Sequence, residues 1–276
     1  MLARFTKMHG LGNDFVLLDL VSQNIRITPA FITRMADRHA GIGFDQLLVA
    51  EPPTQPDLDF RCTIYNADGS EAEQCGNGMR CFARFVRDRG LTSAAQLQIE
   101  TSNRTVTCHV HEDQVTVDMA TPELKPACIP FVADKQAVLY PLDVPGVGRQ
   151  RIASVSMGNP HAILTVSEVD QAPVSQLGPL IEHHERFPNR VNVGFMQVLS
   201  RDHIRLRVFE RGVGETKACG TGACAAVVGG ILQGLLGHDV TVTLQGGDLK
   251  VKWQGGTEPV LLTGPTARVF EGCVHI

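Results

Sequence analysis

The feature that most constrains the fold is a repeat that relates the two halves of the chain. Residues 60–66 (FRCTIYN) align without gaps on residues 204–210 (IRLRVFE). Both segments have the β-branched and aromatic residues that are typical of strands. The same offset matches further pairs, namely Glu71 with Glu215, Cys75 with Cys219, Gly76 with Gly220 and Gly78 with Gly222. Because this period is too long for a solenoid, the repeat predicts two related domains in tandem.

Two weaker matches accompany the repeat. Residues 12–14 (GND) match residues 158–160 (GNP), and residues 43–46 (GFDQ) match residues 194–197 (GFMQ). The matched segments keep the same order and nearly the same separation. They extend the predicted duplication over most of the chain.

In each half the sequence predicts a strand, then a loop rich in glycine and charged residues, and then a helix that begins at the C-G-x-G motif. The helix at 219–236 is apolar almost all round, which predicts burial inside a wrapping sheet. The helix at 75–89 is amphipathic, and Arg80, Arg84, Arg87 and Asp88 are expected on its solvent side. A further helix is expected at 29–38, with Thr28 as N-cap and Pro29 as first residue.

Short alternating segments separate these helices, and glycine and proline punctuate them densely. Strands are predicted at 96–101, 105–110, 114–119, 151–156, 161–166, 241–244 and 249–253. Many short strands around two central helices indicate an α+β fold. The expected domain boundary lies near residues 120–122. The first domain would comprise 1–119 with a C-terminal strand at about 265–276, and the second 120–264.

Composition narrows the class of protein. Hydrophobic residues make up 43% and charged residues 20% of the 276 residues, as in a globular protein, and the formal net charge is −4. That charge does not favour nucleic acid or a membrane surface as a partner, since both would require a basic face. The N-terminus lacks the apolar core of a signal peptide, so a cytoplasmic location is expected.

The eight cysteines lie at 62, 75, 81, 108, 128, 219, 224 and 273. In a reducing compartment they should be thiols. No C-x-x-C pair occurs, so a zinc site is not expected, and no metal ligand is assigned. Most of them, including Cys81 and Cys224 inside the helices, are expected to be buried packing residues.

The two C-G-x-G motifs favour reactive thiols at Cys75 and Cys219. A cysteine in the first turn of a helix lies near the positive end of the helix dipole, which predicts a lowered thiol pKa. The glycine that follows lets backbone N–H groups approach an anion. If the two domains face each other, the thiols meet across one cleft. One thiolate then removes an α-proton while the opposite thiol reprotonates the other face, which is a racemisation.

Several motifs, running almost end to end and in one order, carry a resemblance to a known family. They lie at 8–15 (MHGLGNDF), 66–70 (NADGS), 75–81 (CGNGMRC), 158–161 (GNPH), 210–216 (ERGVGET) and 218–222 (ACGTG). With these motifs the chain resembles diaminopimelate epimerase. The resemblance implies two pseudo-symmetric domains, each a mixed sheet or barrel wrapped around a helix. It also implies no pyridoxal phosphate, no metal, and interconversion of LL- and meso-diaminopimelate for lysine and cell-wall synthesis.

The resemblance also implies roles for individual residues. Cys75 and Cys219 would be the acid–base pair, and His161 and Glu210 would support them. The implied substrate ligands are Asn13, Gln46, Asn66, Gly76, Asn77, Asn159, Asn192, Glu210, Arg211, Gly220 and Thr221. The fork of Arg211 suits the distal carboxylate of the substrate. The asparagines suit its distal ammonium and carboxylate. The family's homodimer uses a tyrosine near the C-terminus, and that position is here Phe270.

Simpler interpretations compete with some of these roles. Residues 12–14 and 66–69 are also ordinary turn sequences. Glu182, His183, His184 and Glu185 suggest a metal site, but a solvated helix face is the preferred interpretation.

Of three rival functions, only the first is a serious alternative. A proline or hydroxyproline racemase would share the two-cysteine logic but needs no site for a distal head group. A thiol oxidoreductase normally has its two cysteines close in sequence. A non-catalytic binding module would tolerate loss of both thiols.

Overall fold

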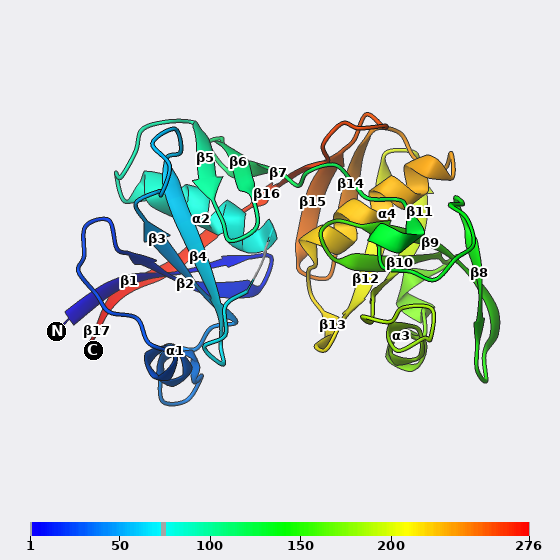
Figure 1. The fold of residues 1–276 in the computed structure, drawn as a ribbon, viewed down its shortest axis with the longest axis horizontal. Coiled ribbons are helices and arrows are strands. Elements are labelled where there is room, and N and C mark those ends of the chain that lie inside the picture. The colour runs from blue at the N-terminus through cyan, green and yellow to red at the C-terminus, as the bar shows by residue number, and fades with distance from the viewer. Residues whose placement is uncertain (1, 73–75, 276) are drawn as a thin grey trace. The chain divides into compact units, whose positions relative to one another are not determined.

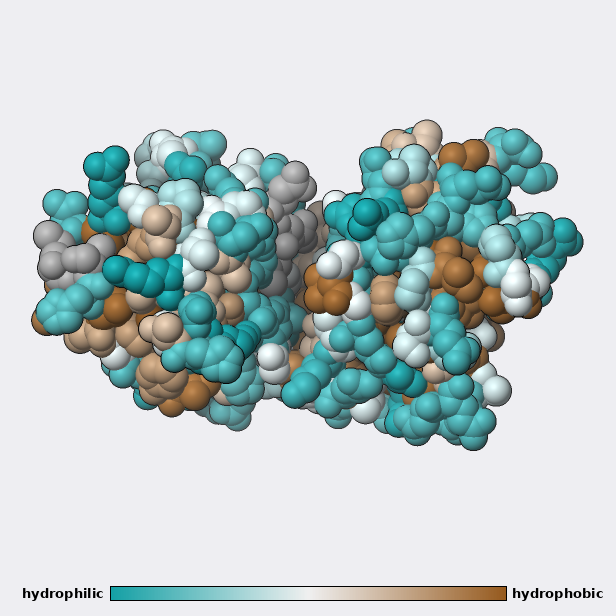
Figure 2. Space-filling view, turned by 90° about the horizontal axis from the view of Figure 1, so that it is seen from below, coloured by the Kyte–Doolittle hydropathy of each residue, from teal (hydrophilic) through white to brown (hydrophobic). Residues whose placement is uncertain are grey.

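The computed structural model describes residues 2–72 and 76–275, which divide into two compact units. Unit 1 comprises Met1–Asp118 and Thr263–Ile276, and unit 2 comprises Met119–Leu262. Figure 1 shows that each unit consists of strands placed around one long helix, with a second, short helix at its margin. In Figure 2 the visible surface of each unit is mostly hydrophilic, with smaller apolar patches.

Unit 1 wraps its strands around helix α2 (Gly76–Asp88). The helix contacts β1, β2, β3, β6 and β7. The short helix α1 (Pro29–Ala36) begins at the predicted N-cap, where the N–H of Phe31 donates to Thr28 Oγ1 at 3.2 Å. The strands are β1 (Leu2–Gly10), β2 (Asn13–Asp19), β3 (Gln46–Glu51), β4 (Phe60–Asn66), β5 (Gln96–Glu100), β6 (Thr105–Val110), β7 (Gln114–Asp118) and β17 (Ala267–His275).

Unit 2 repeats this plan around helix α4 (Gly220–Leu232), which contacts β9, β10, β11, β12 and β15. The residues of α4 are buried on almost every side, as its apolar sequence predicts. The strands are β8 (Tyr140–Val144), β9 (Gly148–Ser156), β10 (Pro160–Thr165), β11 (Asn192–Ser200), β12 (His203–Glu210), β13 (Gly214–Thr216), β14 (Asp239–Leu244) and β15 (Gly247–Lys252). Strand β16 (Leu261–Pro265), in which the chain re-enters unit 1, pairs with β7.

Three successive strand pairings of unit 1 recur in unit 2. In unit 1, β2 runs parallel to β3, β3 antiparallel to β4, and β4 parallel to β5. In unit 2, β10, β11, β12 and β14 repeat these three relationships. The predicted α+β duplication is therefore confirmed.

The register of the pairing shows that one of the predicted sequence matches is wrong. Gln46 begins β3 opposite Phe15, and Asn192 begins β11 opposite His161, so Gln46 and Asn192 are equivalent. Gly194 then corresponds to Leu48, and not to Gly43 as the match of residues 43–46 with 194–197 requires. The short G-F-x-Q similarity gave the wrong register because the sequence alone does not show which residues pair across neighbouring strands.

Helix α3 (Val174–Glu182) was not predicted from the sequence. Its buried residues Val174, Leu177 and Ile181 follow helical spacing and pack into the core of unit 2 with Phe187 and Val191. Pro179 inside the helix obscures this signal, because proline usually ends a helix.

No helix in the described part of the chain is both long enough and apolar enough to cross a membrane.

Candidate active site

Cys219 lies at the start of α4, where it is the N-cap residue. Its side chain is buried, with 4% of the residue exposed. The N–H of Gly222 donates to Cys219 Sγ at 3.4 Å, and Thr221 Oγ1 lies 3.5 Å from the same sulfur. A Cβ atom added to Gly222 would lie 3.2 Å from that sulfur and 3.2 Å from Val208 Cγ2. Glycine at 222 therefore lets the first turn of the helix close on the thiol.

The electrostatic surroundings of Cys219 differ from the prediction. Burial raises the pKa of the Cys219 thiol well above its ordinary value, and the nearby Glu210 carboxylate raises it further. Contacts with Thr221 and the Gly222 amide act in the opposite direction but do not outweigh these causes. The prediction of a lowered pKa is thus wrong for Cys219, because it considered the helix terminus without desolvation or a carboxylate.

Glu210 ends β12, at the hairpin that leads into β13. Thr216 Oγ1 donates a hydrogen bond to Glu210 Oε1, which fixes the carboxylate at the base of the hairpin. The next residue, Arg211, is exposed, and its Nη1 donates to Asn189 O at 3.1 Å. A carboxylate and a guanidinium therefore lie on consecutive residues, Glu210 and Arg211, at this hairpin.

Asn192 ties this hairpin to the neighbouring strand. It is 3% exposed, its Oδ1 accepts from the Arg211 N–H at 3.0 Å, and its Nδ2 donates to Pro160 O at 3.0 Å. Both of these hydrogen bonds are made to backbone groups, and the amide has a second N–H and a second oxygen lone pair besides them. In this structure Asn192 braces the hairpin.

His161 is completely buried in β10. Its Nε2 lies 3.0 Å from Asn159 Oδ1, whereas its Nδ1 has no hydrogen-bond partner among residues 2–72 and 76–275. Burial, with a smaller effect of the Arg211 charge, lowers the pKa of His161 to about 3. The imidazole is therefore neutral at neutral pH, and Nε2 donates to Asn159 while Nδ1 remains an acceptor.

In unit 1 the first turn of α2 is held by a buried arginine. Arg80 is 0% exposed, its Nη2 donates to Asn77 Oδ1 at 2.9 Å, and its Nη1 lies 3.4 Å from Gly76 O. Asn77 Nδ2 in turn donates to Asn13 Oδ1 at 3.4 Å. The prediction that Arg80 faces solvent is wrong, because its guanidinium is buried and contacts residues of the first turn of the same helix.

A second pair of amides lies where β3 and β4 meet. Gln46 and Asn66 are opposite each other, and Gln46 Nε2 donates to Asn66 Oδ1 at 3.0 Å. Asn66 Nδ2 donates to Ser70 Oγ at 3.1 Å across the turn that follows. Both side chains are half-buried.

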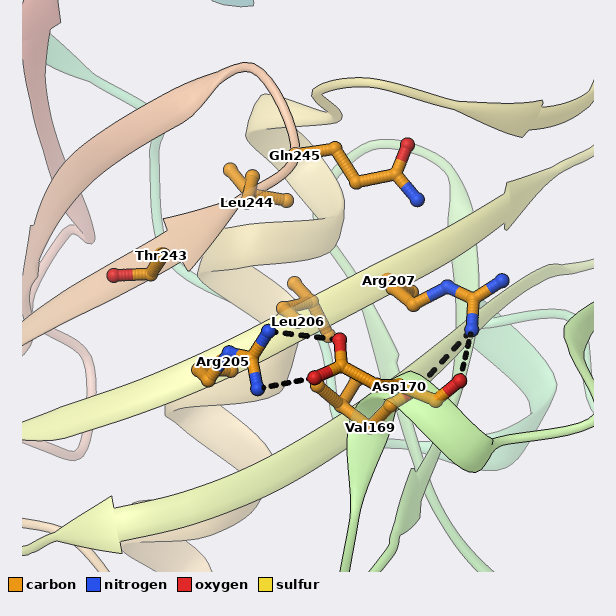
Figure 3. Close-up of a pocket in the computed structure, with 8 residues that line it drawn as sticks. All are labelled: Val169, Asp170, Arg205, Leu206, Arg207, Thr243, Leu244 and Gln245. Carbon is orange, nitrogen blue, oxygen red and sulfur yellow. Dashed lines mark hydrogen bonds and ion pairs between the residues drawn. The ribbon is translucent and has the colours of Figure 1, made fainter.

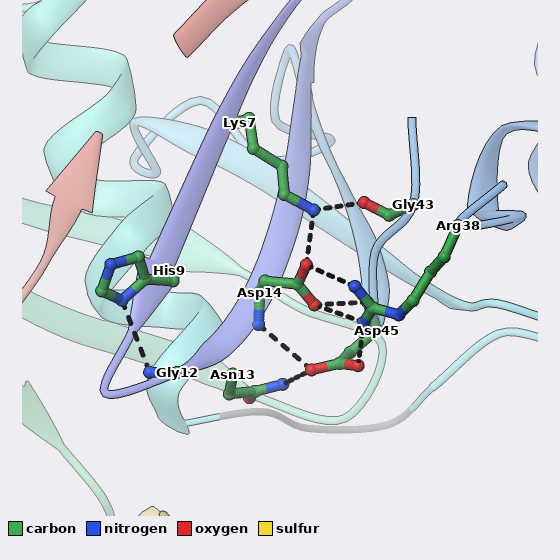
Figure 4. A network of polar contacts seen from close by, with 8 residues as sticks. All are labelled: Lys7, His9, Gly12, Asn13, Asp14, Arg38, Gly43 and Asp45. Atoms are coloured by element: carbon green, nitrogen blue, oxygen red, sulfur yellow. Dashed lines mark hydrogen bonds and ion pairs between the residues drawn. The ribbon is translucent and has the colours of Figure 1, made fainter. Parts of the chain in front are cut away.

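A network of charges continues from Asn13 toward α1 (Figure 4). Asn13 Nδ2 donates to Asp45 Oδ2 at 2.8 Å, and Arg38 bridges Asp45 and Asp14 at 2.7 Å to each. Lys7 reaches both Asp14 and the carbonyl of Gly43. Burial alone would raise the pKa of Asp14, but Arg38 and Lys7 hold that pKa well below its ordinary value. Asp14 therefore remains ionised at neutral pH, and the hydrogen bond to Asp45 orients Asn13.

The strand register makes most of the predicted site residues equivalent in pairs. The pairs are Asn13 with Asn159, Gln46 with Asn192, Asn66 with Glu210, Gly76 with Gly220, and Asn77 with Thr221. Each set lies within its own unit at the start of the central helix and the adjoining strand ends. Cys75, the predicted partner of Cys219, lies outside the described residues.

Sequence reasoning missed Glu182. Residues 182–185 were predicted to be a solvated helix face, but Glu182 is 4% and His184 8% exposed. Glu182 Oε1 accepts the N–H of Gly212 at 2.7 Å, and His184 Nε2 lies 3.2 Å from Asp143 O. Hydrogen bonds to the backbone of distant segments account for this burial, and the local sequence contains no signal for them.

No group of three or more His, Cys, Asp or Glu side chains in the described ranges is arranged to hold a metal ion. A shallow pocket elsewhere on unit 2 is shown in Figure 3. There Arg205 holds Asp170 through two hydrogen bonds of 2.8 Å, and Arg207 binds the backbone of the same loop. This pocket includes none of the predicted site residues.

Comparison with known proteins identifies the family. A model described as diaminopimelate epimerase matches residues 5–125 and 153–269. The chain belongs to the diaminopimelate epimerase family. A relative named diaminopimelate epimerase from Pseudomonas entomophila (strain L48) is 58% identical, and one from Ectopseudomonas mendocina (strain ymp) is 56% identical. Each alignment covers 100% of both chains.

The diaminopimelate epimerase fold also extends to more distant proteins. The structure of a hydroxyproline epimerase from Agrobacterium vitis matches with a TM-score of 0.72 at 14% identity, covering 99% of this chain and 92% of the other. At that identity the match shows a shared fold alone.

Proposed function

We propose that the chain interconverts LL- and meso-diaminopimelate, with Cys75 and Cys219 acting on opposite faces of the α-carbon. One thiolate takes the α-proton and the opposite thiol gives up its own, so the protons balance and no cofactor is needed. Family membership and full-length identity of 56–58% support the reaction. The buried Cys219 thiol at the start of α4 is the structural observation that carries the mechanism.

Cys219 is suited to begin as the proton donor. Burial and the Glu210 carboxylate raise its pKa and so favour the thiol form. Neutral His161 adds no positive charge that would favour the thiolate. When the reaction runs in the other direction, the roles of the two cysteines are exchanged.

The remaining site residues bind and orient the substrate. The backbone N–H groups around Gly76 and Gly220, at the starts of α2 and α4, suit the carboxylate next to the reacting carbon. Arg211 suits the distal carboxylate, because its fork binds two oxygens at once. The amides and hydroxyl of the set suit the distal head group, and they are Asn13, Gln46, Asn66, Asn77, Asn159, Asn192 and Thr221.

A homodimer is part of this proposal. Phe270 in β17 is 47% exposed and packs edge-on against Phe5, with ring centroids 5.8 Å apart. An exposed aromatic residue on a strand suits a contact with a second copy. Sedimentation velocity should give about twice the chain mass of 29.9 kDa and, for Phe270→Glu, the mass of one chain.

The test is incubation of the reduced, chelator-treated protein with LL-diaminopimelate in D2O, followed by chiral separation and mass analysis. The proposal expects the meso isomer with one deuterium at the inverted carbon. Proline and hydroxyproline, the substrates of the rival racemases, should neither invert nor take up deuterium. Inversion of either, with diaminopimelate unchanged, would overturn the assignment.

A further inference from the structure

Glu182 occupies an unusual place for a carboxylate. It is the last residue of α3, and its side chain is 5% exposed. Its Oε1 accepts a hydrogen bond of 2.7 Å from the N–H of Gly212 in the β12–β13 hairpin. A buried carboxylate is costly unless it is hydrogen-bonded, so this backbone contact accounts for its position.

The peptide groups on both sides of Arg211 are each held by a buried side chain. Asn192 accepts the N–H of Arg211 at 3.0 Å, and Glu182 accepts the N–H of Gly212. Because each peptide group is planar, holding both planes fixes φ and ψ of the residue between them. The direction in which the Arg211 side chain leaves the backbone is then fixed as well.

We infer that Glu182 is a positioning residue that, together with Asn192, aims Arg211 at the distal carboxylate of the substrate. This inference rests on the proposed function, in which Arg211 binds that group. The second peptide plane depends on Glu182, because the hairpin bends away from β12 at Gly212, whose φ is +74°.

The basic side chains near Glu182 are more distant from its carboxylate than the Gly212 amide. Arg190 Nη1 lies 3.8 Å from Oε1, and His183 Nδ1 lies 3.5 Å from Oε2. Both of these partners are 54% exposed, so water screens them. The hydrogen bond with Gly212 therefore determines the role of Glu182. For this role the position of the acceptor oxygen matters more than the negative charge of the carboxylate.

The equivalent turn in unit 1 is braced differently. Ala67 stands where unit 2 has Arg211, and the turn is closed by its own side chains, with Asp68 Oδ1 accepting from the Ser70 N–H at 2.9 Å. Because Ala67 has no long side chain to be oriented, hydrogen bonds within the turn are sufficient there.

Two conservative substitutions distinguish the effect of the acceptor oxygen of Glu182 from the effect of its negative charge. Glu182→Gln keeps an oxygen at the same reach, and its KM for diaminopimelate should stay within about twofold of the wild type. Glu182→Asp keeps the charge but withdraws the oxygen by one methylene, and KM should rise about fivefold with kcat little changed. Glu185→Asp, a substitution at an exposed neighbour, is the matched control. The reverse order, with Gln impaired and Asp normal, would overturn the inference.

A double-mutant cycle tests whether Glu182 acts through Arg211. Arg211→Ala should raise KM by itself, and adding Glu182→Asp to it should raise KM no further. Additive effects would contradict the inference. Amide hydrogen exchange gives a readout independent of activity: the Gly212 N–H should exchange faster in Glu182→Asp than in the wild type or Glu182→Gln. Equal exchange in all three would refute the positioning role, whereas a wild type inactive on diaminopimelate would refute the proposed function alone.

Discussion

Unit 1 and unit 2 share three successive strand pairings and a central helix at the same place, yet they differ in the side chains at matched positions. The main contrasts, given as unit 1 against unit 2, are Phe15 against His161, Asn66 against Glu210, Ala67 against Arg211, and Arg80 against Cys224. At the first three of these positions unit 2 has an imidazole, a carboxylate and a guanidinium, whereas unit 1 has a phenyl ring, an amide and a methyl group. At the fourth position the order is reversed, because unit 1 has the buried guanidinium of Arg80.

This difference shows that the two halves of a duplicated fold can keep one backbone arrangement and differ in the side chains around it. The C-G-x-G sequence is kept in both halves, as the proposed mechanism requires. The surrounding ionisable groups are free to diverge. In unit 2 Glu210 adds to the effect of burial in raising the pKa of the Cys219 thiol, whereas in unit 1 Asp45 orients Asn13 by hydrogen bonding.

The largest effect is expected when unit 2 is made to resemble unit 1 at Glu210. Glu210→Gln removes the carboxylate that raises the pKa of Cys219, so that pKa should fall. The variant also loses a residue that the family motifs imply supports the two thiols, and kcat should fall about 100-fold. Steady-state kinetics and alkylation of the Cys219 peptide against pH would measure both effects.

Glu215→Gln is the matched control for this substitution. Glu215 lies in the same hairpin and pairs with Arg207, with Nε to Oε1 at 2.6 Å. Its kcat should stay within about twofold of the wild type. An unchanged kcat in Glu210→Gln would contradict the assigned role of Glu210.

A smaller effect is expected for His161→Phe, which copies Phe15 of unit 1. Because the imidazole is buried and its Nδ1 has no partner in the described part of the chain, the phenylalanine variant should fold as well as the wild type, while its kcat falls about tenfold. A loss of folding, followed by circular dichroism, would show that the two positions are not equivalent.

The same variant should change how stability depends on pH. The folded-state pKa of His161, about 3, lies below its ordinary value of 6.5, so the unfolded chain binds the proton more readily between these values. Stability is fully present above pH 6.5 and is lost as the pH falls toward 3. Between pH 6.5 and 5 the wild type should lose about 2 kcal/mol that His161→Phe retains. Urea unfolding at the two pH values would measure the difference, and parallel losses would contradict the burial of a neutral imidazole.

The smallest effect is expected in the charge network of unit 1. Arg38 is 52% exposed, so Arg38→Gln should lower the free energy of unfolding by no more than about 1 kcal/mol. The loss should shrink at high salt, because salt screens exposed charges. Urea unfolding at low and high salt would test this, and a larger, salt-independent loss would be the contrary result.

The sequence predicts the duplicated fold well, because the hydrophobic periods and the two C-G-x-G motifs are local signals. The buried helix α4 and the N-cap at Thr28 are confirmed for this reason. Burial of Glu182 was missed because its partner, the N–H of Gly212, is distant in sequence. Burial of Arg80 was missed because the strands that surround α2 cannot be read from the sequence of the helix itself. The direction of the Cys219 pKa shift was missed because desolvation depends on packing that no local motif reveals. Roles at the other site residues were predicted from family motifs, since an asparagine in a turn gives no functional signal by itself.

The central claim is that two thiols share one α-carbon, and single-cysteine variants test it most directly. Cys75→Ala and Cys219→Ala would each be incubated with LL- and with meso-diaminopimelate in D2O, with Cys224→Ala, a substitution at a buried residue of the same helix, as control. The account predicts inversion by the wild type and by Cys224→Ala, and a loss of at least about 100-fold in both directions for the other two variants. Inversion at near wild-type rate by either Cys75→Ala or Cys219→Ala would contradict it.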